Sequence, residues 1–373
     1  MIAVLKRELG RIRSTPRLWW LLLFIPVLVS LTLSLTFSER IPQNLPVVLV
    51  DLDQTPQARQ LQRAFEAAPG IALVSVEPDM GKAAAYIRRG RAHAVLVIPA
   101  GFARDLVRGE QPRIQVYVNR QASTSGNVVL SNISITTITA SFGAGLEVGV
   151  LPAMLVDARP LFNPGLDFSR FLALPLTVAV LHVLMVVVAI DVTGRELREG
   201  TAGQWLDSAG GRVGSALVAK LLPYFLWFGL FGAAILLLMV QSLSVEIRGS
   251  AVYWLLGWVF LVAACFGLGV FLIALLDNLR LATSVASVLV SPAFAYSGMT
   301  FPTMAMSGFA AFWSMVLPLG HFLHFQTGQL AMGASIQAGM VHLAWLLAFA
   351  LLPVLTLGRW QRLLSDERMW GEA

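Results

Sequence analysis

The chain has 373 residues, of which 57% are hydrophobic and only 13% are charged. Because soluble domains carry about 25% charged residues, this composition excludes a soluble globular protein. The formal net charge of +6 would also suit nucleic-acid binding, but in membrane proteins a basic excess gathers in cytoplasmic loops, and we expect no nucleic-acid partner. The single cysteine, Cys265, lies in an apolar run, which excludes an intramolecular disulfide and a thiolate metal site.

The N-terminal residues predict an interfacial helix followed by a first membrane span. Within residues 1–17, apolar side chains recur at helical spacing with cations opposite, which is typical of an amphipathic helix at the surface of a lipid bilayer. Pro16 is expected to end this helix. Residues 18–37 are long enough to cross a hydrocarbon core of about 30 Å. Since a cleaved signal has an apolar region of only about 7–15 residues, we expect an uncleaved anchor.

Residues 38–165 are polar and predict an inserted α/β domain on the periplasmic side. Short apolar runs alternate with helical patterns, which is typical of a small α/β layer. We expect strands at residues 46–53, 71–76, 94–98 and 113–118. We expect helices at residues 55–68, 80–89 and 102–109, and a long helix over residues 123–152 that leads back to the membrane.

Residues 168–358 predict the rest of an α-helical bundle with six spans in all. The apolar stretches lie at residues 168–190, 215–240, 251–276, 281–296 and 340–357. Lys220, near the start of the third span, is expected to extend its amine to the interface. Arginines near span ends gather on one side of this topology, in residues 1–17, 191–213, 277–280 and the tail 359–373. The positive-inside rule therefore places both termini in the cytoplasm.

A few ionisable side chains lie in or beside the predicted spans, where such groups are functional candidates. His182, midway along the second span, is a candidate proton relay, but we favour a neutral imidazole hydrogen-bonded inside the bundle. Asp191 and Asp277 lie at span ends, where water can solvate them. His321 and His324 would need further metal ligands, and none lies near them in the sequence. We therefore expect no metal site.

Motifs of nucleotide hydrolysis and hydrolytic catalysis are absent from the sequence. GxxxxGK[ST], HExxH, GxSxG and CxxC do not occur, so we expect no catalytic residue and no cofactor in this chain. The glycine pairs 145/149, 229/232 and 267/269 are weak indications of close helix contacts, and only 145/149, which lies outside the predicted spans, has true GxxxG spacing.

Three stretches carry a family resemblance. The strings LPVVLVDLDQTPQARQLQRAF and AYIRRGRAHAVLVIPAGFARDLVRG form the first. The second, RELREGTAGQWLDSA at residues 195–209, fits the pattern E-[KR]-E-x-G-T-x-x-x-L with one residue of slack, at Glu196, Glu199, Gly200, Thr201 and Leu206. The third, within residues 297–325, fits S-G-x-x-[FY]-P…[LI]-P-[LT], at Ser297, Gly298, Phe301, Pro302, Leu317 and Pro318.

These stretches, in this order, resemble the permease subunit of an ABC-2 type transporter. The resemblance is to the type V exporter fold, in the bacterial subgroup with a large external domain between the first two spans that is often associated with drug export. It implies that residues 195–209 form a coupling helix that docks on a separate ATP-binding subunit, which binds ATP and Mg. The coupling residues would include Arg195, Arg198 and Trp205 beside the motif positions. Residues 297–325 would form short outer helices that dip into the bilayer and cap the pathway.

The resemblance also implies partners and leaves alternatives open. Two permease chains, identical or paralogous, would enclose a route between spans one, two and five, and a periplasmic membrane-fusion adaptor would contact the external domain. The cargo would be an amphipathic or hydrophobic drug, lipid or peptide. One alternative is a membrane-anchored receptor or assembly scaffold that uses its external domain. Another is an ion-coupled carrier, which is disfavoured because no predicted span has a carboxylate at its centre.

Overall fold

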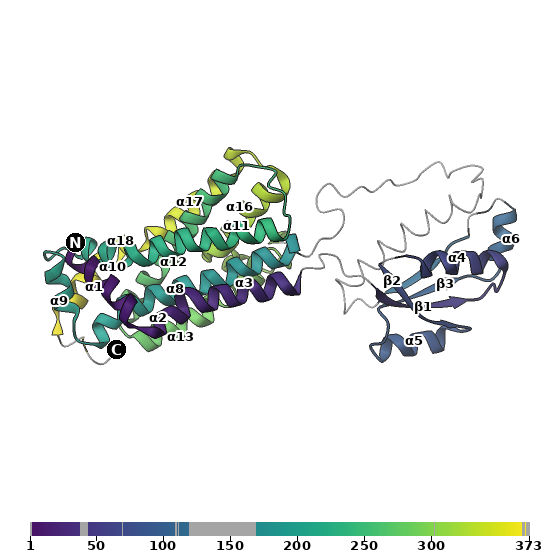
Figure 1. Cartoon of the computed structure of the whole chain (residues 1–373), viewed down its shortest axis with the longest axis horizontal. Coiled ribbons are helices and arrows are strands. Elements are labelled where there is room, and N and C mark those ends of the chain that lie inside the picture. Colours follow the sequence, from purple (N-terminus) through teal and green to yellow (C-terminus); the bar gives the residue numbers. More distant parts are fainter. Residues whose placement is uncertain are drawn as a thin grey trace. The chain divides into compact units, whose positions relative to one another are not determined.

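A computed structural model describes residues 2–37, 44–68, 70–108, 110, 112–118, 169–301, 303–367 and 370. The chain divides into two compact units, one formed by Met1–Arg40 with Asp167–Ala373 and the other by Ile41–Leu166. Figure 1 shows the first as a bundle of helices and the second as a sheet with helices beside it. The long helix predicted over residues 123–152 lies outside the described residues, as does Pro302.

The smaller unit has the predicted alternation of strands and helices. Its elements are β1 (Leu45–Asp51), α4 (Pro56–Glu66), β2 (Ile71–Glu77), α5 (Met80–Arg88), β3 (Ala94–Ile98), α6 (Phe102–Val107) and β4 (Gln115–Val118). The strand order is β2-β1-β3-β4. β1 runs parallel to β2 and β3, and β4 is antiparallel to β3. The predicted strands and helices between residues 45 and 118 are therefore confirmed to within a few residues.

The sheet of the smaller unit is covered on both faces. Val48, Val50, Val95 and Val97 point to one face and form a buried cluster with Ala83 of α5. Figure 1 shows α4 on the opposite face of the sheet. Alternate residues of a strand point to opposite faces, so central strands that are covered twice are apolar throughout, as β3 is with all five residues buried.

The membrane unit is built from long apolar helices. The N-terminal elements are α1 (Ile2–Ser14), α2 (Pro16–Trp19), a π-helical turn (Trp20–Phe24) and α3 (Ile25–Thr36). After the smaller unit come a second π turn (Ser169–Ala173), α8 (Leu174–Arg198), α9 (Ala202–Ser208), α10 (Val213–Trp227), a third π turn (Phe228–Gly232), α11 (Ala233–Ser242) and α12 (Ala251–Leu276). The rest are α13 (Leu279–Val290), α14 (Ala293–Tyr296), a 3-10 turn (Thr303–Ala305), α15 (Gly308–Val316), α16 (Pro318–Thr327), a π turn (Gly328–Met332), α17 (Ile336–Ala350), α18 (Leu352–Leu355) and α19 (Leu357–Ser365).

Six helical stretches of the described chain are long and apolar enough to cross a membrane. They are Pro16–Thr36, Phe171–Arg198, Val213–Ser242, Ala251–Leu276, Leu279–Tyr296 and Ile336–Leu355. A seventh stretch, Gly308–Val316 with Pro318–Met332, is long and apolar enough only when its two helices are taken together, and these are bent by 82° relative to each other. The six predicted spans are therefore found, and a broken apolar pair lies between the last two.

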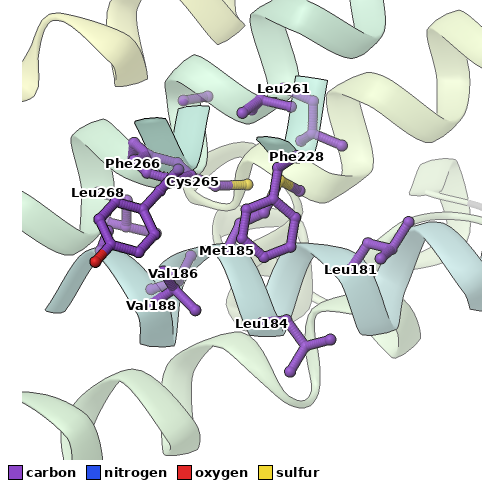
Figure 2. Packing of buried hydrophobic residues seen from close by; sticks show 14 of the residues in the cluster. Leu181, Leu184, Met185, Val186, Val188, Phe228, Leu261, Cys265, Phe266 and Leu268 are labelled. Atoms are coloured by element: carbon purple, nitrogen blue, oxygen red, sulfur yellow. The ribbon is translucent and has the colours of Figure 1, made fainter. Parts of the chain in front are cut away.

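Helix α12 packs against α8 and α17 with little space between backbones. A Cβ on Gly269 would lie 2.7 Å from the Cβ of Ala189, and one on Gly267 would lie 2.3 Å from the carbonyl oxygen of Phe349. Both distances are too short for any other residue, so these two glycines mark close helix contacts, whereas Gly145 and Gly149 lie outside the described residues. Figure 2 shows Met185 of α8 close to Cys265 of α12 in this core.

Two helices of the membrane unit extend beyond the elements that the sequence predicts. The second span was expected to end at residue 190, but α8 continues to Arg198, because Asp191 pairs with Arg195 one turn later and because cations of α1 and α10 neutralise the buried Glu196. The tail, expected from residue 359, begins within helix α19 (Leu357–Ser365), which was not predicted. Its Trp360, Leu363 and Leu364 are fully buried in the main core of the membrane unit.

Candidate functional site

Segments far apart in the sequence meet at one end of the membrane unit: α1, the α8–α9 turn, α10 and α19. Figure 1 shows α1, α9 and α10 together there. Trp205 of α9 and Trp360 of α19 meet edge to face, with ring centroids 6.1 Å apart. Arg359 of α19 pairs at 2.6 Å with Asp277, the residue that caps α12, and this hydrogen bond raises the pKa of Arg359. The cation-rich segments of the sequence thus lie at one end of the bundle.

The α8–α9 turn is shaped by Gly200. This residue has φ +66°, a left-handed conformation that glycine adopts without strain. The N–H of Thr201 donates to the carbonyl of Glu196 at 2.9 Å, and the N–H of Gly200 donates to that of Leu197 at 3.3 Å. This pair of bonds is a Schellman motif, which satisfies the last carbonyls of a helix and reverses the chain. It brings Thr201 back toward Glu196.

Glu196 is fully buried and has four side-chain partners. Lys220 donates to its Oε1 at 2.7 Å and Arg11 donates to the same oxygen at 3.1 Å. Arg7 and the Thr201 hydroxyl also donate to this carboxylate. Burying a lone carboxylate is strongly unfavourable, so Glu196 is stable at this depth only because helices α1 and α10 supply cations.

Lys220 is also fully buried, which corrects the expectation that its amine extends to the interface. Its Nζ donates to Glu8 at 2.6 Å and to Glu196 at 2.7 Å. It lies 5.0 Å from the ring centroid of Trp205, within the range of a cation–π contact. Two carboxylates and an aromatic ring replace water around the amine. Lys220 therefore points inward.

The remaining contacts complete a compact charge cluster. The Tyr224 hydroxyl donates to Oε2 of Glu8 at 3.1 Å. Arg11 reaches outward as well, to the exposed Glu199 at 2.7 Å. We define the charge cluster by its three cations and three carboxylates, namely Arg7, Arg11, Lys220, Glu8, Glu196 and Glu199. The charges balance, and the cluster joins α1, α8 and α10 through side chains.

The predicted coupling residues separate into a buried and an exposed group. The buried side chains are Arg195, Glu196, Trp205 and Leu206, and the exposed residues are Arg198, Glu199 and Gly200, with Thr201 half-buried. Trp205 is held in place by the Trp360 ring and by a hydrogen bond from its Nε1 to the carbonyl of Ala216 at 3.2 Å. The buried group has no surface to offer a partner. The outward face of α9 consists instead of Gln204, Asp207 and Ser208.

The predicted outer segment contains a sharp break at Leu317 and Pro318. Leu317 is extended, with φ −112° and ψ 129°, and Pro318 begins α16 as its first residue. Both are buried, whereas Phe301 is exposed. The break produces the 82° bend between α15 and α16. A pair bent in this way is either a broken span or a re-entrant segment.

The start of the outer segment is held close to α16. The hydroxyl of the buried Ser297 donates to the carbonyl of Phe294 at 2.6 Å. Gly298 has φ +84°, and a Cβ there would lie 2.8 Å from the His324 ring. The chain therefore needs glycine at this position both for its conformation and for the close approach.

The histidines differ from the expectations drawn from sequence. His182 is fully buried, but neither ring nitrogen has a hydrogen-bond partner among the described residues, so the hydrogen-bonded imidazole favoured above is wrong. His342 of α17, distant in sequence, lies beside His321 and His324, with ring centroids 6.0 and 5.7 Å away. No group of three metal-ligating side chains in the described part of the chain has a geometry that would hold a metal ion.

Sequence reasoning missed the contribution of α1 to the charge cluster. Its cations were expected to lie opposite its apolar face, yet Arg7 and Arg11 point toward Glu196. The useful pattern was the spacing of Val4, Glu8 and Ile12, which places a carboxylate on the apolar face at i, i+4 and i+8. A lone acid on such a face predicts a buried cation opposite it.

This architecture is that of a polytopic membrane protein with an α/β unit inserted after its first span. A family model described as "ABC-2 family transporter protein" matches residues 16–358, and the chain belongs to this family. Among its relatives, the inner membrane transport permease YhhJ of Escherichia coli (strain K12) is 26% identical over 323 residues, which are 83% of this chain and 84% of the relative. The protein of that name from Shigella flexneri has the same values.

The family and the spans together establish the general class of the protein. It is a transporter permease subunit and a multi-pass inner-membrane protein. Permeases of this family work in general with an ATP-binding partner subunit.

Proposed function

We propose that this permease is one half of an exporter that moves an amphipathic or hydrophobic drug, lipid or peptide out of the cytoplasm or its inner leaflet. A separate ATP-binding subunit, which holds ATP and Mg and carries out hydrolysis, supplies the energy. Both termini lie in the cytoplasm and the α/β unit lies in the periplasm, in accord with the cations gathered at the end that carries α1 and α9. Two such chains, identical or paralogous, enclose a route beside α2–α3, α8 and α13.

The observation that carries this proposal is the rigid mounting of α9. Trp205 and Leu206 are buried against the bundle, while Gln204 and Asp207 face outward beside Arg198 and Glu199. The charge cluster ties the preceding turn to α1 and α10. A force on the outward face of α9 is therefore transmitted to the first three spans rather than absorbed by a loose loop. Such a mounting suits a coupling helix.

Transport also requires a cover at the opposite end of the route. We assign this role to residues 297–325, whose bent apolar pair α15–α16 is too hydrophobic to be a solvated loop. Irregular backbone at membrane depth must be covered by protein, and Leu317 and Pro318 at the bend are buried. The external unit is the natural contact for a periplasmic membrane-fusion adaptor.

Co-purification of the tagged chain from its own cells tests the coupling role. Native chain should retain an ATP-binding subunit, and Gln204→Arg should lose it, because the substitution adds a bulky cation to the outward face without touching the charge cluster. Gln60→Arg is the matched control, since Gln60 is an exposed glutamine on α4 of the other unit. It should retain the subunit.

The outcomes separate this proposal from its alternatives. If native chain and both variants carry no ATP-binding subunit while remaining intact, the receptor or scaffold and the ion-coupled carrier become the better descriptions. Equal loss from Gln204→Arg and Gln60→Arg would show that α9 is not the docking element.

A further inference from the structure

A pocket of about 590 Å³ opens between α2, α8 and α13 at the end of the bundle that carries the charge cluster. This volume lies in the range of small-molecule sites. Its cationic lining residues are Arg17, Arg198 and Arg280. Each lies at or within one residue of the end of a span, because the spans begin at Pro16, end at Arg198 and begin at Leu279. Three spans thus contribute one guanidinium each to a common rim.

The pocket is cationic at its rim because these charges are not neutralised by described neighbours. The three arginines make no ion pair or side-chain hydrogen bond with a described residue. Among the lining residues the one carboxylate is Asp191, and it is already paired with Arg195. Arginine presents a planar fork of donors that matches phosphate and carboxylate oxygens.

The wall of the pocket changes character with depth. Trp20, Leu21 and Val187 form an apolar side of the wall, and Thr283 and Ser284 of α13 add two hydroxyls. At a rise of about 1.5 Å per residue, Leu21 lies about 6 Å farther into the membrane than Arg17. Val187 lies about 16 Å farther in than Arg198 by the same measure. A cationic rim therefore leads into a slot with one apolar side.

We propose that this pocket binds an anionic amphiphile, with a phosphate-type head group on the three arginines and an apolar tail against Trp20, Leu21 and Val187. The slot favours a tailed molecule over a free anion, since a soluble anion would leave the apolar wall unused. The inference rests on the proposed function in one respect: it makes this amphiphile the cargo or the lipid at the entrance of the route beside α2–α3, α8 and α13.

Equilibrium binding to the purified full chain in neutral detergent tests the assignment without any ATP-binding subunit. The probe is a fluorescent short-chain phosphatidylglycerol, compared with a phosphatidylcholine of the same tail and label. The triple variant Arg17→Gln, Arg198→Gln, Arg280→Gln should weaken phosphatidylglycerol binding at least tenfold. The matched control, Arg13→Gln, Arg212→Gln, Arg362→Gln, removes three exposed arginines outside the pocket lining, and it should change binding less than twofold.

A second variant keeps the result interpretable if the triple variant folds poorly. Ser284→Trp leaves the arginines in place and fills the slot, so it should weaken binding of the tailed probe. Equal losses in the triple variant and its control, or equal binding of phosphatidylcholine, would overturn the proposal. Full displacement of the probe by millimolar inorganic phosphate would assign the site to a free anion and overturn the amphiphile. Retention of the ATP-binding subunit is scored separately, so failure here leaves the coupling proposal standing.

Discussion

Glu196 in the membrane unit and Asp53 in the α/β unit both join segments that are far apart in the sequence, but they are held in different ways. Glu196 is fully buried and is surrounded by the side chains of Arg7, Arg11 and Lys220. Asp53 is only half-buried and accepts from the backbone N–H groups of Gly101 at 2.8 Å and Ala103 at 3.0 Å. A carboxylate removed from water needs opposite charges, whereas one that keeps part of its hydration is held by neutral donors.

The largest loss of stability is expected at Lys220, because two buried carboxylates depend on its charge. Lys220→Met leaves Glu8 and Glu196 buried without the cation between them, although Met fills nearly the same volume. Removing one partner of a buried ion pair costs about 3–5 kcal/mol. We expect a strongly lowered melting temperature, measured as loss of the monodisperse species in detergent after heating.

Charge balance provides the control for this experiment. Lys6→Met makes the same substitution on the exposed face of α1 and should leave the melting temperature nearly unchanged. Lys220→Met combined with Glu8→Gln removes one charge of each sign and should recover part of the loss. If the double variant is no more stable than Lys220→Met, shape rather than charge determines the stability of this site.

Substitution of Asp53 should cost less stability than substitution of Lys220, and the cost should depend on pH. Burial acts to raise the pKa of Asp53, but hydrogen bonds from Thr55 and from the backbone of Ala103 and Gly101 outweigh it and lower the pKa below its ordinary value of 3.8. A lowered pKa means that the stabilisation is complete above 3.8 and is lost as the pH falls through the folded-state value. Asp53→Ala should cost about 2 kcal/mol at neutral pH and little in acid.

Hydrogen–deuterium exchange of peptides from β3 and α6 checks this prediction. After correction for intrinsic rates, the difference in protection between wild type and Asp53→Ala should be present at pH 7 and should shrink on acidification toward pH 3. Asp79→Ala is a useful comparison, because the Asp79 carboxylate caps α5 by accepting from the backbone N–H of Lys82 at 2.9 Å and makes no hydrogen bond to a distant segment among the described residues. A difference that grows in acid would contradict the assigned direction of the pKa.

The contrast between the two carboxylates also shows what the sequence could predict. Strands and spans follow from local patterns, so β3 (Ala94–Ile98) and α12 (Ala251–Leu276) have the predicted bounds. The partners of Glu196 come from residues 7, 11 and 220, and no local pattern specifies that pairing. The extension of α8 was missed for the same reason, since its polar last turns are stabilised by partners on other helices.

The family motifs identified the segments that form the site, but they could not distinguish the buried residues of these segments from the exposed ones. Glu196 and Glu199 are both motif positions, yet one is fully buried in the charge cluster and the other is exposed at its edge. Periodicity cannot separate them, because α8 ends at Arg198, between the two, and Glu199 no longer follows the helical spacing. Arg17 and Arg280 were likewise used only to orient the chain, and Arg198 was assigned only to coupling, since the convergence of the three depends on how α2, α8 and α13 pack.

The turn that positions Glu196 should tolerate change better than its cations do. Gly200→Ala retains every partner of Glu196 but forces a left-handed alanine, which costs about 1 kcal/mol. Apart from its chain neighbours, no atom of the described residues lies within 4 Å of the added Cβ, so the effect should be conformational strain alone. Gly214→Ala, in helical conformation on α10 and equally open, should be neutral or stabilising in the same melting assay. If both variants lowered the melting temperature equally, the loss at Gly200 could not be attributed to its left-handed conformation.

The smallest effect belongs to the outer edge of the charge cluster, where Arg11 meets Glu199 at 2.7 Å in contact with solvent. Exposed ion pairs contribute less than about 1 kcal/mol and are screened by salt. Glu199→Gln should lower the melting temperature slightly at low ionic strength and not at all in about 1 M salt, where the screening length falls to about 3 Å. Lys220→Met should remain destabilising in both conditions, because salt does not reach the buried pair. A Glu199→Gln effect that persists at high salt would mean that the edge of the cluster is as protected as its centre, and the distinction between the coupling surface and its buried support would be lost.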